Sequence, residues 1–524
     1  MHTILPFLLA MIAVIVLLEM LATRLRIAYP ILLVIAGLLL SFVPGLPPVR
    51  INPNLIFFLV LPPLLFEAAW SISFKEMKKW WRIISSFAFL VVFFTALSVA
   101  LAANYFIPGF SIALGFLLGG IVSPPDAVST GAITKFVKIP WGSATILEGE
   151  SLLNDASALI IFRFALVAVG TGQFIWQDAA VSFIWMIVGG AGIGLILGWM
   201  FVQMHRRLPT DAASDITLTI IEPYMMYWVA EQLHSSGVLA VVAGGLYLSN
   251  KRLLFLNSIS RIQAYSVWEN FVFILNGVVF LIIGLDLPEI VGGLRSEGIS
   301  LNMAMGYGLI VTAVLILVRI VSAYVAMVAT LIFRPKVMPV TTLRGRLVLP
   351  LVLGWSGMRG VVSLAAALSI PVTYNQVAFP QRNLILFITF VVILFTLVVQ
   401  GLTLPYLINR SRVFVATAGE TEEETIRKIR HGLKQHIYRF LKENYEHKLP
   451  DHVGVQKMMQ HWEERSKAEK DDWMDDKIKV IYLETLESQR QYLTALNNDP
   501  LINEELIRRQ LYQIDLEEVR LRML

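Results

Sequence analysis

The stretch Glu148-Gly-Glu-Ser-Leu-Leu-Asn-Asp155 decides how this chain is interpreted. It places three carboxylates and one amide in the first half of an otherwise apolar run, from Ile146 to Val169. An ionisable group at bilayer depth costs roughly 2.5–3.5 kcal/mol on insertion scales, so it is by default a functional-site hypothesis. The stretch therefore predicts a polar site inside a membrane-spanning helix.

The composition is that of a polytopic membrane protein. Of 524 residues, 56% are hydrophobic and only 15% are charged, and the mean hydropathy is +0.68; these values are typical of membrane proteins. The pI near 9.2 comes from basic loop residues and does not indicate nucleic-acid binding. The chain has no cysteine, which excludes disulfides, thiolate metal sites and cysteine catalysis.

Charge divides the chain into two parts. Residues 1–411 contain 24 Lys/Arg against 16 Asp/Glu, whereas residues 412–524 contain 19 against 22. We interpret 1–410 as a transmembrane domain and 411–524 as a soluble, helical and regulatory tail whose partner the sequence does not identify. In the tail, Val480, Leu483, Leu486, Ile502, Leu506, Leu511, Ile514, Leu516 and Val519 recur roughly at helical spacing.

The apolar runs predict an all-α fold of about 13 spans, since a helix needs about 20 apolar residues to cross a bilayer. The runs are 4–22, 28–45, 54–73, 84–106, 109–137, 145–168, 180–204, 214–233, 236–249, 268–287, 302–333, 347–371 and 383–408. The first run lacks a basic leader and a cleavage site, so it is interpreted as a retained span. The long run 302–333 is expected to be tilted or broken.

The loops between these runs predict the orientation. Alternate loops hold 18 Lys/Arg, while the other set holds only Arg50, Arg295 and Arg382. By the positive-inside rule the N-terminus is outside and the tail is cytoplasmic.

Two runs are interrupted at their centres. Ser123-Pro-Pro-Asp126 breaks the run 109–137, and the glycines of Gly354-Trp-Ser-Gly-Met-Arg-Gly360 indicate a break in the run 347–371. Broken helices at mid-membrane are typical of the ion sites of secondary transporters. The two runs are seven spans apart and cross in opposite directions, which predicts inverted repeats over about 1–170 and 214–410.

Several charged side chains lie at membrane depth. Asp155 and Asp126 are predicted to be functional, and Ser151 lies one turn before Asp155 on the same face. Arg319 and Arg359 must each be paired, because a permanent cation at that depth cannot be left alone. Three other groups are interpreted as follows: Arg163 snorkels to the outer interface, Glu19 and Glu222 are lone structural or dimer-facing acids, and Glu67 either pairs in the bundle or lines a funnel.

At this point the chain resembles the monovalent cation/proton antiporter superfamily, in the sodium/proton exchanger branch that has an Asn-Asp pair. The motifs that carry the resemblance are Gly149-Glu-Ser-Leu-Leu-Asn-Asp155, Phe57-Phe-x-x-Leu-Pro-Pro63 and Gly357-Met-Arg-Gly360. The resemblance covers about residues 1–410. It implies a homodimer of 13-span protomers with two crossed discontinuous helices, a mobile core domain and a dimerisation domain.

The resemblance also implies a role for each site residue. Asp155 binds cation and proton alternately, Asn154 is its partner, and Ser151 is a ligand of Na⁺ with Asp155. Asp126 neutralises the crossed half-helix ends, and a backbone carbonyl near Pro125 is a further ligand. Glu150 pairs with Arg319, Arg359 supports the broken helix, and Glu67 matches an acid near the site in some members. The family usually has Thr-Asp-Pro where this chain has Pro125-Asp-Ala127.

These residues predict a secondary antiporter that exchanges Na⁺ or Li⁺ for H⁺ with electroneutral 1:1 stoichiometry. No cofactor and no enzymatic activity are expected; the partners are the transported ions, the lipid bilayer and a second protomer. The alternatives are K⁺/H⁺ antiport by the same mechanism and a cation channel, although the chain has no potassium-filter motif. An intramembrane aspartyl protease is a third, but neither Asp126 nor Asp155 lies in a Gly-x-Gly-Asp setting.

Overall fold

The structure is a computed structural model of the chain. It describes residues 4–25, 27–43, 53–126, 131, 141–172, 176–333, 343–374, 377–411, 422–445, 453–467, 476–496 and 504–522. The chain forms two compact units, Met1–Thr417 and Ala418–Leu524.

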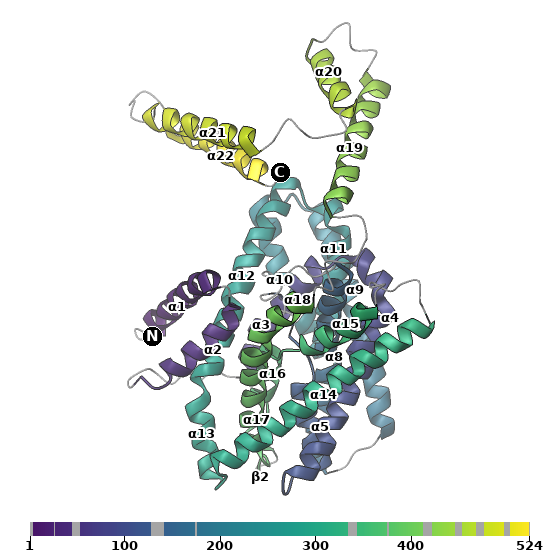
Figure 1. Cartoon of the computed structure of the whole chain (residues 1–524), viewed down its shortest axis with the longest axis vertical. Helices are drawn as coiled ribbons and strands as arrows, with labels where there is room; N and C mark the ends of the chain where they lie inside the picture. The colour runs from purple at the N-terminus through teal and green to yellow at the C-terminus, as the bar shows by residue number, and fades with distance from the viewer. Residues whose placement is uncertain are drawn as a thin grey trace. The chain divides into compact units, whose positions relative to one another are not determined.

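The first unit is a helical bundle (Figure 1). Its N-terminal half contains α1 (Ile4–Leu25), α2 (Tyr29–Leu40), α3 (Pro53–Ser71), α4 (Phe74–Ser85), the π-helix η1 (Ser86–Val91), α5 (Val92–Phe106), α6 (Ile112–Val122), α8 (Trp141–Thr171) and α9 (Trp176–Arg207). Its C-terminal half contains α10 (Ala212–Gln232), α11 (Gly237–Phe255), α12 (Ser258–Leu285), α13 (Leu287–Ser296), α14 (Leu301–Phe333), α15 (Leu343–Trp355), α16 (Val361–Leu368), α17 (Arg382–Phe395), the π-helix η3 (Thr396–Gln400) and α18 (Gly401–Ser411).

The predicted all-α membrane fold is confirmed, and each of the 13 apolar runs contains a helix. Seven helices among the described residues are long and apolar enough to cross a membrane, and three shorter apolar helices accompany them. The long run 302–333 is one unbroken helix, α14, which Figure 1 shows running obliquely across the bundle. Three elements of this unit lie outside the predicted runs: most of α4, which occupies a predicted loop, α13, and a two-stranded antiparallel hairpin of β1 (Thr373–Tyr374) and β2 (Val377–Ala378).

Both predicted interruptions are present as non-helical backbone. The helix α6 ends at Val122, and residues 123–126 continue without helical structure. The second interruption, residues 356–360, separates α15 from α16. Prolines explain the first, because Pro124 and Pro125 donate no backbone hydrogen bond.

Small residues let the helices of the bundle approach closely. A side-chain carbon at Gly37 of α2 or at Gly284 of α12 would overlap the backbone of the other helix. At Gly194 of α9 it would overlap the backbone of Ala240 in α11. Close approach at small residues is how helices associate in a bilayer, where burial of apolar surface gives little driving force.

The second unit contains two helical pairs, α19 (Glu422–Tyr445) with α20 (Val453–Lys467) and α21 (Asp476–Leu496) with α22 (Glu504–Arg522). Of the apolar positions predicted from spacing, Leu486 and Ile514 lie in a small core with Leu521. Three others, Val480, Leu516 and Val519, are exposed on the outer faces of these helices. Residues 497–500, predicted to be the turn, lie outside the described residues.

One polar cluster is fully buried in the first unit at the end of α9. His205 Nδ1 lies 2.9 Å from Asp215 Oδ1, and His205 Nε2 lies 3.0 Å from Glu222 Oε1. Ser260 Oγ donates to Asp215 Oδ2 at 2.7 Å, so the cluster joins α9, α10 and α12. Glu222, interpreted from the sequence as a lone acid, therefore has a histidine partner. This pairing could not be predicted from local spacing, because the partner lies 17 residues earlier in another helix.

We expect His205→Leu to destabilise the protein strongly. The substitution leaves two buried carboxyl groups without their shared hydrogen-bond partner, and each buried polar group left unsatisfied costs about 1–3 kcal/mol. Thermal unfolding in detergent would measure this, with Arg206→Leu as control because Arg206 is exposed on the next position. Equal melting temperatures for the two variants would show that the cluster does not hold the three helices together.

Candidate functional site

The helix α8 carries the predicted site residues into the interior. Glu150, Asn154 and Asp155 are 2%, 0% and 7% exposed. Glu148, one to two turns nearer the start of the helix, is exposed. The acids of this one stretch therefore lie in different environments, and the buried part is centred on Asp155.

Hydrogen bonds bring both interrupted segments to this part of α8. Ser151 Oγ donates to the Pro125 carbonyl oxygen at 3.2 Å. The backbone N–H of Asp126 donates to the Met358 carbonyl oxygen at 2.8 Å. The break after α6 thus contacts both the break before α16 and the helix that carries Asp155.

Arg359 holds the two breaks together through backbone carbonyls. Its side chain is fully buried. Nε donates to the Val122 carbonyl oxygen at 2.6 Å and Nη2 to that of Ser123 at 3.1 Å, while Nη1 donates to the Gly357 carbonyl. Helix ends leave carbonyl groups without intrahelical partners, and the guanidinium satisfies those at the end of α6. The partners of this arginine are thus backbone groups, which sequence reasoning could not name.

Two glycines around Arg359 permit this close packing. A side-chain carbon at Gly360 would overlap the Asp126 carboxyl group, and one at Gly357 would overlap the Arg319 side chain. Asp126 itself is half-buried. Both glycines are therefore needed for the space they leave to charged side chains.

Glu150 and Arg319 form a buried ion pair between α8 and α14. Arg319 Nη1 lies 2.7 Å from Glu150 Oε1, and Nη2 lies 3.1 Å from Oε2. The side chains are 2% and 4% exposed. A bidentate ion pair of this kind neutralises both charges and fixes the geometry of the two side chains. The Glu150 carboxylate is therefore occupied by Arg319.

Asn154 and Asp155, in contrast to Glu150, are not part of this ion pair. Both polar atoms of the Asn154 amide are buried and have no hydrogen-bond partner among the described residues. Asp155 and Asp126 are near enough for their charges to interact. Glu67, on α3, is half-buried and interacts electrostatically with Glu148. Buried polar groups are normally satisfied, so an unpartnered amide beside a buried carboxyl group indicates a ligand site.

Three contributions to the site were not predicted. Thr396 Oγ1, in η3, accepts from the backbone N–H of Arg359 at 3.1 Å. Ser157 donates to the Ala88 carbonyl in η1, which packs against α8. π-Helical turns recur at functional sites, but periodicity does not distinguish them from α-helix. Arg163, interpreted from the sequence as snorkelling to the outer interface, pairs with Glu231 on α10 while 38% of its side chain stays exposed.

The oxygen atoms near Asp155 suit a hard monovalent cation. They comprise carboxyl groups, a serine hydroxyl, an amide and a backbone carbonyl, the donor types that such cations prefer. No group of three or more His, Cys, Asp or Glu side chains that could hold a metal ion occurs in the part of the chain that the structure describes. Ala127, where the chain departs from the family pattern, lies outside that part.

Known proteins resemble this chain along most of its length. The model of the transmembrane sodium/hydrogen exchanger family matches residues 9–410. A Mycobacterium bovis protein named as an uncharacterized Na⁺/H⁺ exchanger is 31% identical, covering 98% of this chain and 95% of that protein. A sodium, potassium, lithium and rubidium/H⁺ antiporter of Bacillus pumilus is 33% identical, over 76% of this chain and 60% of the antiporter.

The fold also matches a solved structure. The sodium proton antiporter MjNhaP1 of Methanocaldococcus jannaschii superposes with a TM-score of 0.61 at 18% identity, covering 78% of this chain and 98% of that one. At this identity the match supports the architecture alone. Together with the family match and the site described above, it leads to one conclusion: the chain is an integral membrane protein of the sodium/hydrogen exchanger family.

Proposed function

We propose that this protein is a secondary antiporter in which Na⁺ or Li⁺ and H⁺ compete for the Asp155 carboxylate. The observation that carries the proposal is the position of Asp155, buried beside an unpartnered Asn154 amide where α8 meets the two interrupted segments. A carboxylate that binds either a proton or a cation cannot hold both. This exclusion is sufficient to couple the two fluxes if the site opens to each side in turn.

The neighbouring groups have distinct proposed roles. Ser151 and the Pro125 carbonyl, now hydrogen bonded to each other, supply oxygen ligands, and Asn154 orients the Asp155 carboxylate. Asp126 balances the positive end of a half-helix and the nearby arginines. Glu67 lies on the route toward the exposed Glu148.

Cation-driven proton efflux in proteoliposomes with an acidic lumen tests the function. We expect external Na⁺ or Li⁺, and not choline, to make the lumen more alkaline. A relative is named for sodium, potassium, lithium and rubidium, so a response to K⁺ alone would retain the mechanism and reassign the ion. Failure of every cation with folded protein would contradict antiport and favour a channel.

The same preparation tests the stoichiometry. Only one carboxylate cycles in the proposed mechanism, because Asn154 stands in place of a second acid and Arg319 cannot release a proton. We therefore expect luminal alkalinisation with no Na⁺-dependent current at zero voltage. A current that requires protein and Na⁺ would exclude 1:1 exchange.

We further propose that the tail regulates exchange and faces the cytoplasm, with the protein acting as a homodimer in a bacterial inner membrane. Deleting residues 415–524 should then change the pH dependence of exchange while exchange itself persists. Rates measured across a pH series with deleted and full-length protein would show this. An unchanged pH profile would remove the regulatory role, and native mass spectrometry in detergent would report the oligomeric state.

A further inference from the structure

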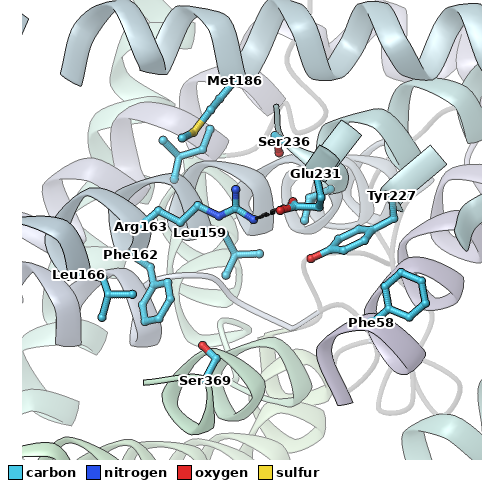
Figure 2. A pocket seen from close by; sticks show the side chains of 12 residues that line it. Phe58, Leu159, Phe162, Arg163, Leu166, Met186, Tyr227, Glu231, Ser236 and Ser369 are labelled. Atoms are coloured by element: carbon cyan, nitrogen blue, oxygen red, sulfur yellow. Dashed lines mark hydrogen bonds and ion pairs between the residues drawn. The ribbon is translucent and has the colours of Figure 1, made fainter. Parts of the chain in front are cut away.

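A cavity of about 360 Å³ lies beyond Asp155 along α8. Figure 2 shows that the side chains of Arg163 and Glu231 meet across it, with Tyr227 and Ser369 pointing toward the same space. The rest of the lining is largely apolar and comes from α3, α8, α9 and α11. The cavity therefore lies between the helix with the proposed cation site and the helices around it.

Leu159 lies between Asp155 and Arg163 along α8 and forms part of the cavity wall. It is 8% exposed and lies one turn from both Asp155 and Arg163 on the same face of α8. At 1.5 Å per residue, Asp155 and Arg163 are about 12 Å apart along the helix axis. The part of α8 that lines the cavity thus begins at Leu159, one helical turn beyond Asp155.

The Arg163–Glu231 pair joins α8 to α10 across the cavity. Arg163 Nη2 lies 2.7 Å from Glu231 Oε1 and 2.6 Å from Oε2. Glu231 Oε1 also accepts from the backbone N–H of Gly237 at 3.2 Å, which fixes the carboxylate to the start of α11. Arg163 therefore belongs to α8, the helix that carries the proposed cation site. Its partner Glu231 belongs to α10, which this hydrogen bond connects to α11.

We propose that this cavity is the passage from Asp155 to one side of the membrane and that Arg163 and Glu231 form its gate. The inference rests on the proposed antiport. In the proposed alternating access, α8 moves relative to α10 and α11. The ion pair of Arg163 and Glu231 stabilises only the conformation in which these two side chains are in contact. Because both side chains are partly exposed, the pair should bias that equilibrium by only about two- to five-fold.

The absence of native cysteines permits a direct test by cross-linking. The double variant Arg163→Cys/Glu231→Cys is joined with a bis-methanethiosulfonate reagent that dithiothreitol cleaves. We expect exchange in proteoliposomes to stop when the thiols are linked and to return on reduction. The matched control is Trp185→Cys/Leu233→Cys. Trp185 on α9 and Leu233 at the end of α10 are both exposed and in contact with each other, and neither belongs to the proposed site. Linking these two cysteines should leave exchange unchanged.

A second measurement does not depend on exchange. In a Leu159→Cys background, Glu231→Gln should raise the rate of thiol labelling by about two- to five-fold, because the passage then opens more often. The charge-swapped variant Arg163→Glu/Glu231→Arg should return the rate toward the starting value. Unchanged labelling, or full exchange by the linked double variant, would overturn the gate. Failure of the unmodified protein to exchange any cation would instead contradict the antiport itself.

Discussion

Replacing Asp155 by Asn should reduce cation-driven proton efflux to the rate of protein-free vesicles. The amide has nearly the shape of the carboxylic acid, so packing around this buried position is kept. It cannot ionise, however, and it therefore neither releases a proton nor offers a negative charge to a cation. In the proposed mechanism both halves of the cycle use this one group, so no residual exchange is expected.

The control for Asp155→Asn is Glu148→Gln, seven residues earlier on the same helix. Glu148 is exposed, and the same loss of one carboxylate there should leave exchange near the wild-type rate. Substantial exchange by Asp155→Asn would move the site elsewhere, and loss of exchange in both variants would indicate a general effect on α8.

Binding can be separated from transport by thermal unfolding. A ligand that binds only the folded protein stabilises it by about 2.7 kcal/mol at a concentration of 100 Kd. We expect Na⁺ to raise the melting temperature of the wild type and of Glu148→Gln, and to have no effect on Asp155→Asn. A Na⁺ response that survives in Asp155→Asn would mean that the cation binds without this carboxylate.

The burial of the site could be predicted from the sequence, because an acidic side chain within an apolar run is energetically unfavourable and is therefore kept there for a function. Acids are expensive in an apolar run, so the location of Asp155 in 145–168 already indicated a buried group. The prolines at 124–125 and the glycines around Arg359 likewise predicted interrupted helices from backbone chemistry alone. In each case the feature could be predicted from a single residue type, because that residue does not suit the apolar helix in which it occurs.

The partners of these residues could not be predicted in the same way. Sequence reasoning required a partner for Arg359 but could not identify backbone carbonyls 236 and 237 residues earlier. Similarly, Arg163 at the end of an apolar run is compatible with solvent or with Glu231, and only the packing of α8 against α10 decides between them. Tertiary contacts of this kind leave no periodicity, and the pairing of Glu150 with Arg319 was anticipated only through the family resemblance.

Replacing Arg359 by Leu should cause the largest loss of stability among the site variants. Three buried carbonyl groups, those of Val122, Ser123 and Gly357, would lose their donor. Each buried acceptor left unsatisfied costs about 1–3 kcal/mol. A loss of at least about 3 kcal/mol is therefore expected, a large part of the 5–15 kcal/mol that typically separates folded from unfolded protein.

A matched arginine distinguishes this effect from the general loss of a cation. Arg382 is half-buried and donates to one backbone carbonyl, that of Ile370, at 2.9 Å. Unfolding in detergent should therefore show a much smaller loss for Arg382→Leu than for Arg359→Leu. Arg359→Lys should fall between the two, because the ammonium keeps the charge but lacks the planar fork that reaches both breaks. If Arg359→Lys equalled the wild type, charge alone would hold the two interrupted segments together. If Arg359→Leu matched Arg382→Leu, packing would hold these segments together, and Arg359 would have no supporting role.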